Sequence, residues 1–248
     1  MTTLPSTTTL LSTLFRADLT TQWRNRRSFV LSLLVPVIIL VSAKSAVNAE
    51  KAPYIMSMGI TIGIAASCLM GYANSIARDR DKGIFQRLRV APLPTWAIMS
   101  SRLGVQILMI LVSTIGVFII GFYVDHIQLT VQSYALGLLT SLAAAAVYLG
   151  LGQFIVAFVR NPETVMSTTR LVYLSLIVVG LFGQIGAFGD DMKTVTKWSP
   201  YGTVQNIMAA SLHTGGWSHD ASNALLATLG YAVVFTAVGI RKFSWSNR

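Results

Sequence analysis

ILMILVSTIGVFII, residues 107–120, is the stretch of sequence that decides the class of fold. It is apolar on every face of a helix, whereas a strand of a membrane barrel alternates apolar and polar residues over about ten positions. A helix needs about 20 mostly apolar residues to cross a bilayer. The run is the centre of a longer apolar segment, residues 96–124, and therefore predicts a membrane-spanning α-helix.

Five further segments meet the same length requirement, and the composition agrees with them. Of the 248 residues, 53% are hydrophobic and 11% are charged, whereas a soluble domain carries about 25% charged residues. We expect an all-α integral membrane protein with a cytoplasmic N-terminal segment (1–27), a transmembrane domain (28–240) and a cytoplasmic tail (241–248). The six predicted spans are residues 28–47, 54–77, 96–124, 132–159, 170–188 and 221–240.

The distribution of basic residues predicts how the chain is oriented. The net charge of +10 would suggest a nucleic-acid partner in a soluble protein. Sorted by loop, however, fifteen of the nineteen Lys and Arg fall on one side of the predicted membrane. Because basic residues are enriched on the cytoplasmic side, we predict a multi-pass protein of the cytoplasmic membrane with both termini inside and no nucleic-acid partner.

Two segments outside the spans are predicted to be helical. The N-terminal segment has an apolar face (Leu11, Leu14, Phe15, Leu19) and a polar face (Arg16, Thr20, Arg24, Arg27). This pattern is typical of an amphipathic helix at the membrane surface, although a positively charged flank is the alternative. Residues 201–212 follow a Ser-Pro pair and are too few to cross the bilayer. We predict an external re-entrant or interfacial element there, with an ordinary external loop as the alternative.

The loop after the second span, RDRDKGIFQRLRVAPLP at residues 78–94, is dense in charge of both signs. Gly83 is expected to end the preceding helix, and Pro92 to end a short helix of about two turns that follows it. Ile84 and Leu88, four residues apart, give that helix an apolar edge rimmed by charge. The pattern favours a docking element for another protein over a merely solvated loop.

The sequence contains no pattern of its own for chemistry. It has no Walker A loop and no metal-ligand spacing among His126, His213 and His219. No Asp, Glu or His falls in the middle of a predicted span, where proton-coupled transporters keep their relays. We therefore expect no catalytic residue, no metal site and no cofactor bound by this chain. If the chain transports a substrate, we expect a separate partner to supply the energy.

Uncharged residues within the spans are candidates for a substrate path or for helix packing. Ser67, Asn74, Gln153 and Gln184 are the polar side chains that could line a path. Gly59 and Gly63 form a GxxxG pair, which permits two helices to approach closely and is a candidate dimer contact.

Six spans, a basic amphipathic N-terminal helix and the loop at 78–94 together resemble the type-2 ATP-binding-cassette exporter permeases. The likeness is to their drug- and antibiotic-resistance branch, the daunorubicin-resistance-like membrane subunits. The positions of the family's loop motif are taken by Asp79, Lys82, Gly83, Arg87, Leu88, Pro92 and Leu93. The sequence departs from the family at two of its positions, with Asp79 for the usual Glu and Ile84 for the usual Thr after the glycine.

The resemblance implies a coupling helix seated on a separate ATP-binding subunit, which would hold ATP and Mg²⁺. The coupling residues would be Asp79, Lys82, Gly83, Ile84, Phe85, Arg87, Leu88, Pro92 and Leu93. The resemblance also implies a second permease subunit, either the same chain or a sister chain, in the same bilayer. The expected function is export of an amphipathic drug, antibiotic or lipid-like compound. The alternatives are a six-span channel or secondary transporter, and a membrane-embedded enzyme that acts on lipids.

Overall fold

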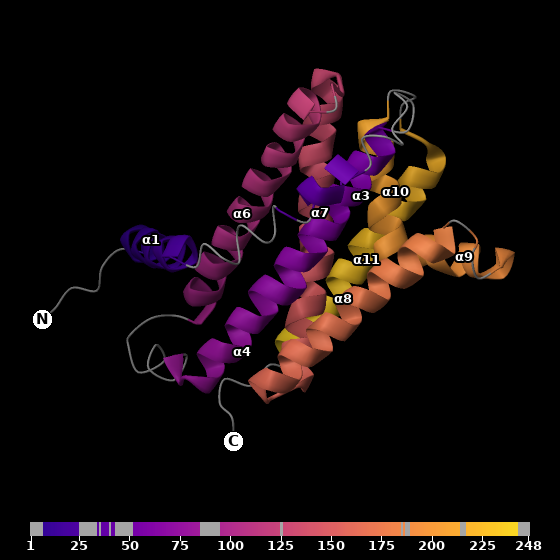
Figure 1. Ribbon diagram of the computed structural model, residues 1–248. Coiled ribbons are helices and arrows are strands. Elements are labelled where there is room, and N and C mark those ends of the chain that lie inside the picture. The colour runs from indigo at the N-terminus through magenta and orange to yellow at the C-terminus, as the bar shows by residue number, and fades with distance from the viewer. Residues whose placement is uncertain are drawn as a thin grey trace, which may run out of the picture.

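The computed structural model describes residues 7–24, 34, 36–39, 41–42, 52–84, 95–124, 126–184, 186, 189–213 and 217–242, and these form helices and no strand. In chain order the helices are α1 (Thr7–Arg24), α3 (Ala52–Ala66), η1 (Ser67–Ala73), α4 (Asn74–Asp81), α6 (Thr95–Val124), α7 (Val131–Phe158), α8 (Pro162–Gln184), α9 (Asp190–Trp198), α10 (Pro200–Leu212) and α11 (His219–Lys242). The predicted all-α fold is confirmed (Figure 1).

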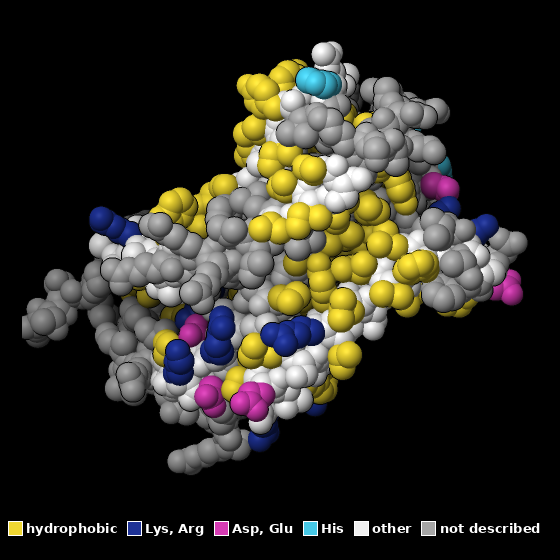
Figure 2. All heavy atoms as spheres, viewed as in Figure 1, with side chains coloured by type: hydrophobic (Ala, Val, Ile, Leu, Met, Phe, Trp, Pro, Cys, Tyr) yellow, Lys and Arg dark blue, Asp and Glu magenta, His cyan; other side chains and the backbone are white. Residues whose placement is uncertain are grey.

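Within the part of the chain that the structure describes, five helices are long and apolar enough to cross a membrane. They are α6, α7, α8, α11 and the continuous helix made of α3, η1 and α4, and each lies at one of the last five predicted spans. Figure 2 shows hydrophobic side chains over the middle of the visible face, with charged side chains at its lower end and at its left and right edges. The first predicted span, 28–47, falls largely outside the described residues, so the count of six stays a prediction.

Helix α7 lies at the centre of the bundle and packs most extensively along α11. Glycines on both helices make this approach close. A Cβ atom at Gly150 would lie 2.8 Å from Thr236 Oγ1, and one at Gly239 would lie 3.1 Å from the Phe154 nitrogen. Small residues permit such close packing in membranes, where no hydrophobic driving force brings helices together. The outer faces of α8 and α11 stay exposed and apolar, as Leu171 and Leu226 show.

Two short helices fill the segment between α8 and α11. Ser199 separates them, because its hydroxyl accepts from the Gly202 nitrogen at 3.1 Å and caps α10. Helix α10 packs against α3, α7 and α11 and buries Tyr201, Ile207 and Met208. Its 13 residues are too few to cross a bilayer, and whether it re-enters the membrane stays a prediction. Helix α9 had no counterpart in the sequence prediction.

Helix α1 lies against the lower part of α6 (Figure 1). Its apolar face is half-buried, whereas Arg16 and Thr20 are exposed. Phe15 makes the contact, since a Cβ atom at Gly104 would lie 3.3 Å from its ring. A helix is therefore present where an amphipathic one was predicted, and its apolar face packs in part on the bundle. Its position at the membrane surface stays a prediction.

The second span extends beyond its predicted end at residue 77. The helix continues to Asp81, with seven residues of π-helix inside it. Neighbouring side chains donate to carbonyls of this wider turn: Asn74 Nδ2 to Met70 O at 2.8 Å, and Gln106 Nε2 to Ser67 O at 3.3 Å. Such donors can satisfy backbone carbonyls that lose their regular hydrogen-bond partners in the helix. π-helical turns occur frequently at functional sites.

Candidate functional site

The described root of the charged loop is a sharp helix end at Gly83. The nitrogens of Lys82 and Gly83 donate to the carbonyls of Arg78 and Arg80 at 3.0 and 3.1 Å. Gly83 has a φ of 66°, a left-handed conformation that only glycine adopts without strain. The prediction that Gly83 ends the helix is confirmed, because α4 stops at Asp81 and the chain turns at Lys82 and Gly83.

Arg80 fixes this end of α4 to the end of α7. Its side chain is 2% exposed. Nη1 donates to the Val156 carbonyl at 2.8 Å, and Nη2 donates to the carbonyls of Val159 and Arg160, each at 2.7 Å. The last carbonyls of a helix have no partner within it and carry partial negative charge. The guanidinium therefore caps α7 with charge-assisted hydrogen bonds.

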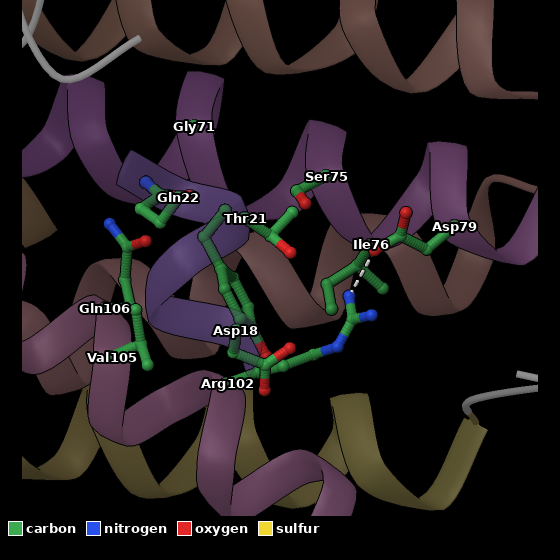
Figure 3. Close-up of a pocket in the computed structure, with 11 residues that line it drawn as sticks. Asp18, Thr21, Gln22, Gly71, Ser75, Ile76, Asp79, Arg102, Val105 and Gln106 are labelled. Carbon is green, nitrogen blue, oxygen red and sulfur yellow. Dashed lines mark hydrogen bonds and ion pairs between the residues drawn. The ribbon is translucent and has the colours of Figure 1, made fainter. Parts of the chain in front are cut away.

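Asp79 and Asp18 tie α4 and α1 to α6. Arg102 of α6 forms a hydrogen-bonded ion pair with Asp79 (Figure 3). One residue earlier, the Ser101 hydroxyl donates to Asp18 Oδ2 at 2.5 Å. The side chains of the ion pair are only 14% and 21% exposed, so water screens them less than it screens a surface pair.

A cavity lies beside this ion pair, between α1, the η1–α4 helix and α6 (Figure 3). At one end it is lined by the charged side chains of Asp18, Asp79 and Arg102. At the other end it is lined by the uncharged amides of Gln22 and Gln106. The π-helical Gly71 also lines it. Three helices that are distant in sequence thus meet at the base of the charged loop.

A comparison with models of known families identifies this chain's family. A model of the ABC-2 type transporter family matches residues 9–212. The chain belongs to the ABC-2 type transporter family. A search of curated proteins found no significant match. The match begins in α1 and ends at the last residue of α10, so it includes the charged loop and all the contacts at its root.

In this ABC-2 family chain, the predicted coupling residues divide into two groups. Asp79 lies in the ion pair with Arg102, Lys82 is exposed, Gly83 forms the turn and Ile84 is half-buried. The remaining five lie outside the described residues: Phe85, Arg87, Leu88, Pro92 and Leu93. Their contact with an ATP-binding subunit stays a prediction.

The candidate path residues are not brought together at one place. Thr169 Oγ1 donates to Asn74 Oδ1 at 3.1 Å, and the Tyr72 hydroxyl donates to Gln153 Oε1 at 3.4 Å. Both contacts join two helices. The Ser67 carbonyl accepts from Gln106, and Gln184 is the last residue of α8. Their role in a path stays a prediction, and the described contacts of Asn74 and Gln153 hold helices together.

The candidate dimer glycines are buried within the chain. A Cβ atom at Gly59 would lie 3.5 Å from the Pro36 carbonyl oxygen, so Gly59 lets α3 approach a residue of the predicted first span. Gly63 is also buried. The GxxxG pair therefore serves packing inside one chain at Gly59, and its use between two chains stays a prediction.

The sequence analysis missed Arg80 and Arg102 as structural residues. It placed Arg80 in the charged loop, and it counted Arg102, near the start of the third predicted span, only among the basic residues of the cytoplasmic side. A signal was present for Arg80, because it continues the buried stripe of Ala73, Ile76 and Ala77 at helical spacing. No comparable signal marks Arg102, whose partner lies 23 residues away in another helix.

Proposed function

We propose that this chain is the membrane subunit of an ATP-driven exporter. Membership in the ABC-2 type transporter family is the observation that carries the proposal. ATP and Mg²⁺ would be bound by a separate subunit, which would seat on the loop after α4. The substrate would be an amphipathic drug, antibiotic or lipid-like compound, because the spans offer apolar walls with uncharged polar groups.

The contacts at the root of the loop support a route for coupling. A force on residues 82–94 would reach α4 through the turn at Gly83. From α4 it would pass to α6 through the pair of Asp79 and Arg102, and to the α7–α8 connection through Arg80. Since α6, α7 and α8 are each long enough to cross the membrane, one movement of the loop would repack several spans together.

The complete transporter would contain two permease and two ATP-binding subunits. A homodimer of this chain and a pairing with a sister chain are both compatible with the exposed apolar faces of α8 and α11. The remaining exposed area would face lipid.

Co-purification of the full chain with its ATP-binding subunit tests the proposal. Gly83→Pro or Arg87→Glu should weaken the complex and abolish stimulation of ATP hydrolysis by the permease, whereas Lys242→Gln, at the end of α11, should do neither. If both loop variants retain assembly and coupled hydrolysis, the docking assignment is wrong. Transport that continues without ATP and stops when the ion gradient is collapsed would overturn the exporter assignment in favour of a secondary transporter.

A further inference from the structure

A second cavity lies at the opposite end of the bundle from the charged loop. Its volume is about 300 Å³, and it is an open cavity lined by the beginning of α3, by α9 and by α10. Tyr54, at the start of the α3–η1–α4 helix, lines it, whereas Asp81 ends that helix 27 residues later. At 1.5 Å per residue, the two ends are roughly 40 Å apart, which is about the full thickness of a bilayer with its headgroups.

The cavity carries positive charge on one wall. Lys193 and Lys197 of α9 both line it and lie four residues apart, on one face of the helix. Lys197 Nζ lies 2.9 Å from Asp220 Oδ2, with side chains 45% and 65% exposed. An ion pair this exposed is weak, so an anionic ligand could draw Lys197 away from Asp220.

Gln205 of α10 lines the other side of the cavity, and its side chain carries a buried acceptor. The Ser57 hydroxyl donates its single proton to the Tyr54 carbonyl at 2.6 Å. It can therefore only accept from Gln205 Nε2, which lies 2.9 Å away. This chain of donors fixes the orientation of the Gln205 amide. The other amide atom, Oε1, is left buried with no hydrogen-bond partner, in a side chain that is 2% exposed.

Helix α9 has the composition of a helix at the membrane surface. Val195 and Trp198 are 61% and 42% exposed beside the two lysines. Tryptophan is favoured at the level of the lipid headgroups, and lysines beside exposed apolar residues are typical of interfacial helices. A ligand that reaches this cavity would thus come from the headgroup layer.

We propose that this cavity binds the headgroup of an anionic phospholipid that carries a free hydroxyl, of the phosphatidylglycerol type. The phosphate lies between Lys193 and Lys197. A glycerol hydroxyl donates to Gln205 Oε1 once a shift of this buried side chain brings that atom to the cavity. A buried acceptor without a donor costs free energy, so the hydroxyl adds selectivity to the charge attraction. The site is separate from the contacts of Asp79, Arg80 and Arg102 at the base of the charged loop, and it goes beyond the proposed transport function.

Lipid binding to the purified full chain, measured by native mass spectrometry, tests the proposal without an ATP-binding subunit. Three lipids with the same acyl chains separate the contributions: phosphatidylglycerol, phosphatidylmethanol (the same charge without a hydroxyl) and zwitterionic phosphatidylcholine. We expect them to bind in that order. The double variant Lys193→Gln with Lys197→Gln should lower the affinity for phosphatidylglycerol by at least about tenfold, because the loss of even one charge-assisted contact has about that effect.

Two further variants distinguish recognition from a structural role. Gln205→Met should make phosphatidylglycerol and phosphatidylmethanol bind equally. Asp220→Asn should strengthen binding of both, because it removes the acid that competes for Lys197. Lys242→Gln, an exposed lysine on α11, is the matched control and should change nothing. Free glycerol phosphate should compete weakly for the site, and complete displacement by it would show that a soluble anion, not a lipid, is the ligand. Equal binding of the three lipids to the unmodified chain would overturn the proposal, as would an unchanged preference in the double lysine variant.

Discussion

The guanidinium of Arg80 in α4 donates to the carbonyl of Val156 in α7 at 2.8 Å, and the two residues are 76 positions apart in sequence. The same side chain also satisfies the carbonyls of Val159 and Arg160. Arg80 therefore caps the C-terminus of α7, and it also connects α4 to the α7–α8 connection by hydrogen bonds.

Arg80→Gln should destabilise the purified chain by at least about 2 kcal/mol, because it leaves carbonyls at the end of α7 without charged donors. The expected result is a lower midpoint of thermal unfolding in lipid nanodiscs. Arg80→Lys should be intermediate, since an ammonium group cannot reproduce the planar fork of the guanidinium. Arg78→Gln removes an exposed arginine from the same helix and serves as the control. Equal unfolding midpoints for Arg78→Gln and Arg80→Gln would show that the cap contributes nothing.

The pair of Asp79 and Arg102 should couple energetically. Asp79→Asn, Arg102→Gln and the double variant form a cycle in which the interaction free energy is about 1 kcal/mol, at the upper end of values for exposed pairs because this one is partly buried. The unfolding free energies of the four proteins measure it. A second cycle, with Asp220→Asn in place of Asp79→Asn, should give no coupling, since Asp220 pairs with Lys197. If the effects of the two single substitutions in the first cycle simply add, the ion pair does not stabilise the contact between α4 and α6.

The features that the sequence predicted correctly are local ones. The sequence Asn161-Pro162-Glu163 is itself a helix-start signal, because Asn can cap and Pro suits the first helical position. In the structure Asn161 Oδ1 accepts from the Glu163 nitrogen at 2.8 Å. The start of α8 at Pro162 follows from the same three residues. The turn at Gly83 likewise depends on residues within one helical turn. Caps and turns of this kind are determined by neighbours in the chain, so a single sequence contains the information.

The features that the sequence left open depend on distant partners. The lengthening of the second span to Asp81 requires a buried position for Arg80, and that position exists only where α7 ends. The contact of Ser101 with Asp18 joins residues 83 positions apart. The π-helix at residues 67–73 is supported in part by Gln106 of α6. Composition alone placed the charges of residues 78–81 in a loop, because nothing nearby in sequence indicates these partners.

The effect of a substitution at Gly83 on coupled ATP hydrolysis should depend on how well the new residue tolerates a left-handed backbone. Alanine in this conformation costs about 1 kcal/mol, and asparagine is better tolerated. We expect coupled ATP hydrolysis to decrease in the order Gly, Asn, Ala, Val, while the unfolding midpoint of the bundle changes little, since the turn lies at its edge. Rates that do not depend on the residue at position 83 would show that the direction of the chain after α4 does not matter for coupling.

Gly202→Ala should disrupt the corner between α9 and α10. A Cβ atom at this position would lie 2.0 Å from the Thr196 carbonyl oxygen, and because that atom is backbone it cannot rotate away. Overpacking of this kind typically costs about 1–3 kcal/mol, and relief would require α9 to move away from α10. Thermal unfolding and proteolysis at the α9–α10 corner should both report the change.

Gly230→Ala is the matched control for this prediction, because it makes the same change in a helix with nothing within 4 Å of the new Cβ atom. Alanine favours a helix over glycine by about 1 kcal/mol, so Gly230→Ala should leave the unfolding midpoint unchanged or raise it. The two variants should therefore differ in sign. If Gly202→Ala also raises the midpoint, the close contact between Gly202 and Thr196 does not exist, and α9 is not held against α10 at this corner.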